Sequence, residues 1–176
     1  MNPINHSPTS LNVRLRPLKA SDEEAFLKGV RKSREILKPW VQVPLSRPAF
    51  QRYVKDMNTA DDKAFAIIRT DTHALVGVVE LRDIFYGHFQ NAYLIYYGFK
   101  PHLKLGLMRQ AVSMVIPIAF KRLKLHRLEA NIQPENASSI ALVRYCGFHN
   151  EGLSPRFLKK NGQWRDHERW ALLVDD

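Results

Sequence analysis

A short segment centred on Gly106 combines the residue types that bind phosphate groups. It follows an aromatic and β-branched run at residues 93–99, which is typical of a buried strand. Pro101 disfavours a helix at the residue before it, and an apolar face with helical spacing begins a few residues later. A strand that enters a helix through a tight turn exposes backbone N–H groups at the positive end of the helix dipole. With Lys104 and Arg109 adding positive charge, this turn is predicted to hold the pyrophosphate of a nucleotide-like cofactor.

The elements that position this turn follow from the hydrophobic pattern along the chain. Strands are expected at residues 11–18, 63–70, 74–84, 93–99, 126–132, 148–160 and 163–174, and helices at 21–36, 48–57, 108–123 and 136–146. The helix after the 93–99 strand should return the chain for parallel pairing, whereas Asn161-Gly162 predicts a hairpin between the last two strands. The expected fold is therefore α+β, a mixed sheet of about seven strands flanked by about four helices.

Two of the helices carry specific start signals. Ser21 and Glu24 have the spacing of a capping box, which would begin the first helix and place Ala25 on its buried side. Asn136 is well placed as the N-cap of the last helix, and Gly147 ends that helix.

The charge of the chain suggests an anionic partner. It has 27 Lys and Arg against 17 Asp and Glu, a formal net charge of +10. RNA, an acidic surface or a phosphorylated cofactor would suit this balance, and a solvated basic surface without a partner is the alternative.

The chain-level features indicate a cytoplasmic protein with one domain. Cys146 is the single cysteine, so no internal disulfide can form, and this usage suits a reducing compartment. Residues 1–10 have no apolar core, so they are not expected to be a signal peptide. They are expected to be a disordered lead-in to a single domain at residues 11–176. The mostly apolar run at 114–120 is far shorter than the roughly 20 residues that cross a membrane, so no membrane association is expected.

Three segments resemble the GNAT N-acetyltransferase superfamily, and within it the branch that acetylates the N-termini of ribosomal proteins. They are the strand-turn-helix around Gly106, the run QPENASSIALVRYCGFHNEG at 133–152, and the ending NGQWRDHERWALL at 161–173. The similarity spans nearly the whole chain from about Val13. The resemblance implies acetyl-CoA as co-substrate and an acetyl transfer to a primary amine.

The pyrophosphate loop of this family usually reads Gln/Arg-x-x-Gly-x-Gly/Ala, often with a further glycine at the second position. The corresponding residues here are Leu103, Lys104, Leu105, Gly106, Leu107 and Met108. Only Gly106 fits the pattern fully, although a methionine at the last position also occurs in this branch. Because main-chain N–H groups hold the phosphates, other side chains are tolerated if the backbone keeps its shape. Lys104 is unfavourable if its position needs a positive φ, and it adds an ammonium near the phosphates.

The resemblance also implies roles along the adjoining strand and the last helix. Tyr97, Gly98 and Phe99 would run beside the pantetheine arm, with a backbone N–H donating to the thioester carbonyl. Asn136 would hold the arm, and Ser139 would lie near the sulfur and help to protonate the departing thiolate. The alternative is that Asn136 is only an N-cap and Ser139 only a small packing residue.

The acid and base of the reaction are less clearly marked. Many relatives place a tyrosine acid at the position occupied here by Val143, and some place a glutamate base at the position of Leu158. Glu80 is the favoured candidate base because it lies on the strand before the 93–99 strand, near its expected active-site end. Weaker candidates are Asp83, Glu129 and Asp166. No metal site is expected, because no histidine pair has i, i+4 spacing and the single cysteine has no cysteine partner.

Three functions remain open from the sequence. The favoured acceptor is the N-terminal α-amine of a protein, with ribosomal proteins as the favoured class and the ribosome as a possible partner. The pKa of such an amine, about 7.7–8.0, makes it easier to deprotonate than a lysine side chain at about 10.4. A small amine such as a polyamine or aminoglycoside is a second acceptor class, although a chain of charge +10 is poorly suited to collect polycations. A basic, non-catalytic RNA- or ribosome-associated module is the third. The sequence does not distinguish a monomer from a homodimer.

Overall fold

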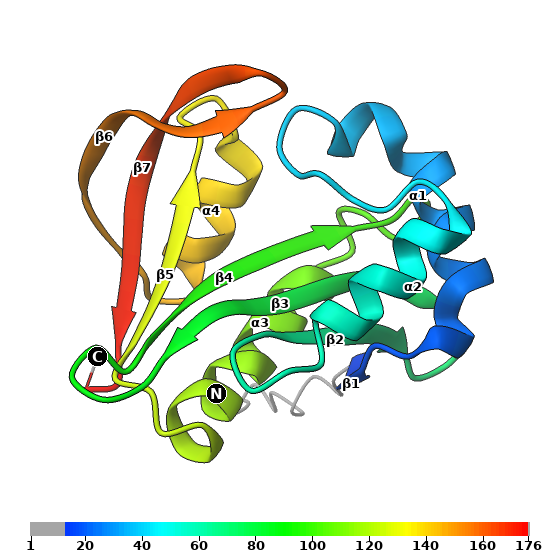
Figure 1. The fold of residues 1–176 in the computed structure, drawn as a ribbon, viewed down its shortest axis with the longest axis horizontal. Helices are drawn as coiled ribbons and strands as arrows, with labels where there is room; N and C mark the ends of the chain where they lie inside the picture. Colours follow the sequence, from blue (N-terminus) through cyan, green and yellow to red (C-terminus); the bar gives the residue numbers. More distant parts are fainter. Residues whose placement is uncertain (1–12, 176) are drawn as a thin grey trace, which may run out of the picture.

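A computed structural model describes residues 13–175, which form one mixed sheet with helices on both faces (Figure 1). The strands are β1 (Val13–Pro17), β2 (Lys63–Arg69), β3 (Leu75–Phe85), β4 (Asn91–Gly98), β5 (Arg127–Ile132), β6 (His149–Lys160) and β7 (Gln163–Leu173). The α-helices are α1 (Glu23–Leu37), α2 (Arg47–Asp56), α3 (Leu107–Pro117) and α4 (Ala137–Tyr145). The seven strands lie in the order β1-β2-β3-β4-β5-β7-β6. The predicted fold class, element order, parallel β4–β5 pairing and β6–β7 hairpin are confirmed.

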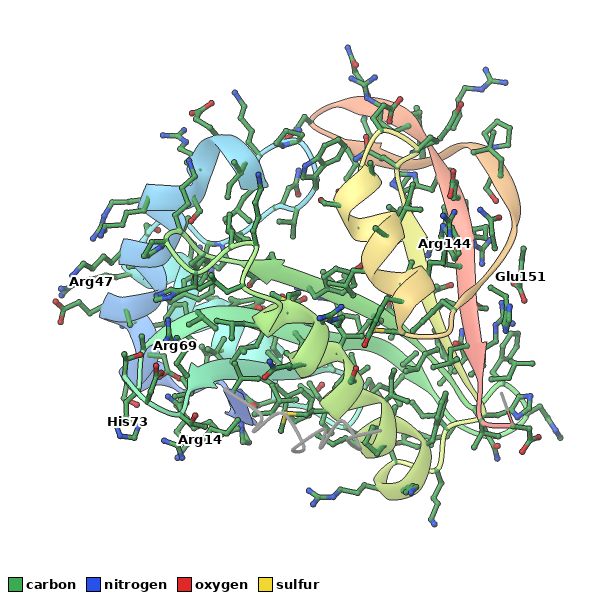
Figure 2. All side chains as sticks on the ribbon, turned by 180° about the vertical axis from the view of Figure 1, so that it is seen from behind. Arg14, Arg47, Arg69, His73, Arg144 and Glu151 are labelled. Atoms are coloured by element: carbon green, nitrogen blue, oxygen red, sulfur yellow. The ribbon has the colours of Figure 1, made fainter. Side chains whose placement is uncertain are left out.

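The two faces of the sheet carry separate hydrophobic cores, because successive residues of a strand point to opposite sides. Tyr97 packs with Phe26 of α1 and Phe50 of α2 on one face. Its neighbour Tyr96 packs on the opposite face with residues of α3, such as Val112. Figure 2 shows this second face, where α3 and α4 lie over the sheet. Adjacent residues of β4 therefore pack into the two different hydrophobic cores.

The strands β4 and β5 pair along only part of their length. Their parallel register is Asn91 with Arg127, Ala92 with Leu128, and Tyr93 with Glu129, and it ends there. Beyond this point β4 stays paired with β3, and β5 stays paired with β7. The two strands consequently diverge toward their carboxyl ends, as Figure 1 shows. The edge of β4 that faces the split keeps backbone groups without a strand partner.

Glu129 fixes the point at which the strands separate. Its Oε1 accepts hydrogen bonds from Asn91 Nδ2 at 3.2 Å and Arg127 Nε at 2.8 Å, and its Oε2 accepts one from Arg169 at 2.5 Å. The residue is 8% exposed. Burial raises the pKa of Glu129, but the hydrogen bonds and charges of the two arginines outweigh it, so the pKa lies below its usual value. Glu129 thus links β4, β5 and β7 as a structural carboxylate.

Two details of the first helix differ from the sequence-based expectation. Ser21 does not open α1, because it lies inside a short 3-10 turn at Ala20–Asp22. Asp22 is the N-cap residue of α1, but its carboxylate makes no cap hydrogen bond to that helix. The carboxylate instead accepts a hydrogen bond from Lys19 N at 2.9 Å, at the start of the 3-10 turn, and pairs with Arg16 at 2.6 Å. Ala25 is exposed and not on the buried side. The ion pair with β1 places the helix start one residue later than the capping-box spacing suggested.

The amino-terminal predictions can be compared only in part. The strand expected at residues 11–18 is described from Val13, and its first two residues lie outside the described residues. The predicted lead-in at 1–10 also lies outside them.

Replacement Glu129→Gln should lower the free energy of unfolding at pH 7 by about 3 kcal/mol, because the two arginines lose a shared buried counter-charge. The folded-state pKa of Glu129 lies below its unfolded value. Its stabilising contribution is therefore complete above the unfolded pKa and is lost as pH falls through the folded pKa. Urea unfolding curves of the two proteins should differ at pH 7 and converge once the pH falls below the lowered folded-state pKa of Glu129.

Glu151→Gln is the matched control, since Glu151 also pairs with Arg127 but lies on the exposed outer strand β6 (Figure 2). That replacement should change the free energy of unfolding by less than about 1 kcal/mol. Equal losses in the two variants would contradict the structural role assigned to Glu129.

Candidate active site

A cleft of about 1220 Å³ occupies the split between β4 and β5. Its walls include residues 93–98 of β4 and 130–132 of β5, and both Tyr96 and Tyr97 line it. Because these two side chains lie on opposite faces of the sheet, the cleft reaches both faces. One half is bordered by α3 and α4, and the other by the α1–α2 connection, α1 and the end of β6.

The turn before α3 has the backbone geometry expected of an anion site. Lys104 and Gly106 are both in the left-handed region, with φ of 61° and 74°. Within residues 13–175, the N–H groups from Lys104 to Met108 have no backbone acceptor. The first turn of α3 contains no acidic residue, so the positive end of its dipole is not neutralised from within the helix. The turn lines the cleft, except for Leu105, whose side chain is 55% exposed.

Arg109 lies beside this turn and is held by a residue of α4. Its guanidinium carbon is 4.1 Å from the centre of the Tyr145 ring, a cation–π contact between α3 and α4. Both residues line the cleft. Sequence reasoning found the positive charge of Arg109 but not its partner, because the two residues belong to different helices.

The open edge of β4 presents one particular amide near the turn. Phe99 N donates to Val76 O at 2.8 Å, so its N–H points toward β3. Since successive N–H groups of a strand point in opposite directions, the N–H of Tyr97 also points toward β3 and that of Gly98 points into the split. A Cβ atom at Gly98 would lie 2.9 Å from Leu103 Cδ2, so the turn packs closely on this glycine.

The start of α4 brings a serine and a tyrosine together. Tyr96 Oη lies 2.6 Å from Ser139 Oγ and also donates to Ser139 O at 3.1 Å. Burial raises the pKa of Tyr96, so its hydroxyl stays protonated. Asn136 acts as the N-cap, since its Oδ1 accepts from Ser139 N at 3.3 Å. Val143 is fully buried, and Tyr96 brings a phenol to this half of the cleft from β4.

On the opposite face, Glu80 belongs to a polar network. It is 2% exposed, Tyr53 Oη donates to its Oε1, and Arg82 Nε donates to its Oε2 at 2.5 Å. The hydroxyls of Tyr53 and Tyr97 lie 3.0 Å apart. Burial and the charge of Glu80 raise the pKa of both phenols, so they remain protonated donors. Glu80 and Arg82 line the cleft.

The other candidate carboxylates are dispersed. Asp83 also lines the cleft. Glu129 is engaged at the strand split, and Asp166 accepts a hydrogen bond from Arg156 N at 2.6 Å within the β6–β7 hairpin. Neither Glu129 nor Asp166 lines the cleft.

Comparisons with known proteins identify the family. A family model described as "Acetyltransferase (GNAT) domain" matches residues 12–149. The chain is a GNAT acetyltransferase. It is 31% identical over 170 residues to a probable N-acetyltransferase, YjcK, of Bacillus subtilis, which covers 92% of this chain and 94% of that protein. The predicted resemblance is thereby confirmed, and the enzyme uses acetyl-CoA as its co-substrate.

Further relatives differ in the acceptor that their names give. The [ribosomal protein uS5]-alanine N-acetyltransferase of Escherichia coli is 32% identical over 112 residues, covering 64% of this chain and 58% of that one. Spermidine N(1)-acetyltransferase of E. coli is 25% identical over 170 residues, covering 94% and 88%. The structure of Mycobacterium smegmatis RimJ in complex with CoA-disulfide matches with a TM-score of 0.86 at 25% identity, covering 93% of this chain and 82% of that one. These relatives support acetyl transfer to an amine without selecting the acceptor.

In this GNAT enzyme, the half of the cleft that lies away from α3 and α4 is bordered by the α1–α2 connection. Two hydrogen bonds hold this connection in place. Asn161 Nδ2, at the β6–β7 turn, donates to Lys38 O at 3.1 Å, and Gln133 Nε2 donates to Pro39 O at 3.2 Å. Trp40 on the same connection lines the cleft. The α1–α2 connection and the hairpin therefore border one side of the opening together.

Neither a metal site nor a membrane span is found in the described part of this acetyltransferase. Residues 13–175 contain no cluster of three or more His, Cys, Asp or Glu arranged to hold a metal ion. Within the same residues, no helix has the length and apolar content needed to cross a bilayer.

Tyr53→Phe should lower the free energy of unfolding by about 1–3 kcal/mol, because Glu80 Oε1 loses a buried donor. Tyr86→Phe is the control, since Tyr86 is 50% exposed, and it should stay within about 0.5 kcal/mol of the wild type. Denaturant unfolding at neutral pH measures both. An unchanged transition midpoint for Tyr53→Phe would mean that the phenol does not support the buried carboxylate.

Proposed function

We propose that this acetyltransferase acts on the N-terminal α-amine of a protein, with ribosomal proteins as the acceptor class. The observation that carries the proposal is the buried carboxylate of Glu80, which lines the cleft and is already paired with Arg82 at 2.5 Å. Lys160 adds a second cation to this wall, and Glu35 and Asp83 add two further carboxylates. Because Arg82 already compensates Glu80, this carboxylate suits the single charge of a protein N-terminus better than the several charges of a polyamine. The similarity to the E. coli uS5-alanine enzyme supports the same acceptor class.

In this proposal the turn from Leu103 to Met108 binds the pyrophosphate of acetyl-CoA. Its N–H groups lack backbone acceptors among residues 13–175, and they stand at the positive end of α3. Lys104 adopts the left-handed conformation that a glycine would take more readily, so the loop keeps its shape at some cost in strain. Lys104 and Arg109 add positive charge beside the phosphates.

The acyl end of the co-substrate is proposed to lie along β4 at Tyr97, Gly98 and Phe99. Only Gly98 among these has an N–H that points into the split, so it is the donor assigned to the thioester carbonyl oxygen. Asn136 uses Oδ1 for capping, which leaves its Nδ2 group to donate to the pantetheine arm. Capping and co-substrate binding are therefore compatible roles for Asn136.

The reaction forms a C–N bond to the acceptor amine and breaks the C–S bond of the thioester. Gly98 N–H stabilises the negative charge that develops on the carbonyl oxygen. Glu80 accepts the proton released by the amine, directly or through a water molecule. Ser139 Oγ donates a hydrogen bond to the departing thiolate, and the Tyr96 hydroxyl, 2.6 Å from Ser139 Oγ, holds the serine in place. Acid and base thus come from opposite faces of the sheet and meet at the split.

A small amine is the second candidate acceptor, favoured by the similarity to spermidine N(1)-acetyltransferase over 94% of this chain. Glu35 and Asp83 line the cleft and could bind a second ammonium group. A non-catalytic RNA-binding module finds no support, because the turn keeps its left-handed residues and the chain belongs to an enzyme family.

The acceptor is tested by measuring CoA thiol release with three substrates at equal concentration. These are a peptide with a free N-terminus and no lysine, the same peptide N-terminally blocked with one internal lysine, and spermidine. The proposal predicts a kcat/KM for the first at least about tenfold above the other two, since the α-amine is far more neutral at pH 7. Faster acetylation of spermidine would replace this acceptor class with small amines.

The phosphate site is tested by a pair of replacements of equal shape. Gly106→Asp and Gly106→Asn both place a side chain at a left-handed position that Asn and Asp tolerate, but only Asp adds a negative charge. Titration calorimetry should show CoA binding weakened at least about tenfold more by Asp than by Asn, the equivalent of about 1.4 kcal/mol. Equal affinities in the two variants would place the pyrophosphate elsewhere.

A further inference from the structure

Lys160 lies in the half of the cleft around Glu80 and has no counter-ion among residues 13–175. It is the last residue of β6 and lines both the main cleft and an adjoining pocket of about 300 Å³. Trp40, Asn161 and Arg165 line the same pocket. A ligand that leaves the main cleft at this point would therefore pass the Lys160 ammonium.

The structure gives Lys160 no ionic partner. No carboxylate of residues 13–175 lies within 4.0 Å of its ammonium nitrogen. Burial lowers the pKa of Lys160, and the charge of Arg82 lowers it further. Arg82 itself is paired with Glu80 at 2.5 Å, whereas Lys160 has no ion pair within residues 13–175. A partly buried cation in this setting gains most from an anionic ligand.

Other charged and polar groups surround the same region. Glu35 and Asp83 line the main cleft, and Glu135 lines the adjoining pocket. None of these carboxylates forms an ion pair with Lys160. Asn131 also lines the cleft, and its buried Oδ1 has no hydrogen-bond partner among the described residues. In this region, Asn131 Oδ1 could therefore accept a hydrogen bond from a backbone N–H of a ligand, and the Lys160 ammonium could bind an acidic group.

We propose that Lys160 binds an acidic side chain within the two residues that follow the acetylated amine. The inference rests on the proposed function, in which the amine lies at Glu80. Glu80, Arg82 and Lys160 line the same cleft, and Lys160 lies where this cleft meets the adjoining pocket. An extended acceptor chain advances about 3.5 Å per residue, so the residues that pass Lys160 are the first ones after an amine held at Glu80.

The bulge of β6 explains how Lys160 reaches this position. The β6–β7 register shifts between Ser154 and Leu158, and Arg156 has a φ of 49° in the shifted segment. Pro155 precedes it, as is common at bulges, because proline cannot donate to a ladder. Lys159 precedes Lys160 on the strand, so its side chain points to the other face and is exposed.

The test compares peptides that begin with Ala and carry Asp, Asn or Lys at the second or third position. Wild-type enzyme should acetylate at least one Asp peptide with a kcat/KM about tenfold or more above its Asn counterpart, and should acetylate the Lys peptides least. Lys160→Met should remove the preference for Asp, and Lys160→Glu should turn it into a preference for Lys. Lys160→Arg should retain it, and so should the neighbouring control Lys159→Met.

Each result decides between the proposals. If wild type acetylates all the peptides equally, or if Lys160→Met keeps the Asp preference, the role of Lys160 is overturned while α-amine acetylation stands. If wild type acetylates spermidine and none of the peptides, both proposals fall. Two further measurements on each variant serve as controls, namely CoA affinity by calorimetry and the thermal unfolding midpoint. Both are expected to equal the wild-type values, which would show that a change in peptide preference does not come from a loss of folding.

Discussion

The parallel pairing of β4 with β5 stops after the Tyr93–Glu129 pair, and the geometry of the site follows from that stop. Each strand continues with a partner on its other side, so neither can close the gap. The buried Glu129 carboxylate, held by Asn91, Arg127 and Arg169, joins three strands at the point of divergence. A sheet that stayed paired would satisfy the edge of β4 and leave no room for a substrate between its faces.

The split brings together groups that the two faces of the sheet would otherwise separate. On one face lie the N-terminus of α3, the Tyr96–Ser139 pair and the Asn136 cap. On the other lies the Glu80 network, and Lys160 lines the same part of the cleft. Because the cleft reaches both, a thioester entering from one side and an amine entering from the other can meet at the edge of β4. The proposed chemistry needs this arrangement more than it needs any single strong base.

Local patterns were sufficient to predict most of the fold. Alternation in β1 and β5, the Asn161-Gly162 turn and the Asn136 cap are each encoded within a few neighbouring residues. The start of α1 was misplaced because Ser21 has the local capping spacing, whereas the ion pair of Asp22 with Arg16 depends on β1. The sequence did not predict which side chains form hydrogen bonds or ring contacts with one another at the site. Tyr53 with Glu80, Tyr96 with Ser139, and Arg109 with Tyr145 are far apart in sequence, and no local pattern marks such pairs.

The account depends on open amides at the turn before α3 and at the edge of β4. Hydrogen exchange measured by NMR, residue by residue, with and without saturating CoA, tests this directly. We expect exchange to slow at the amides from Lys104 to Met108 and at Gly98, while the amides of α2 keep their rates. If CoA slows exchange in α2 or the outer strands and leaves the Gly106 turn unchanged, the site has been assigned to the wrong part of the fold.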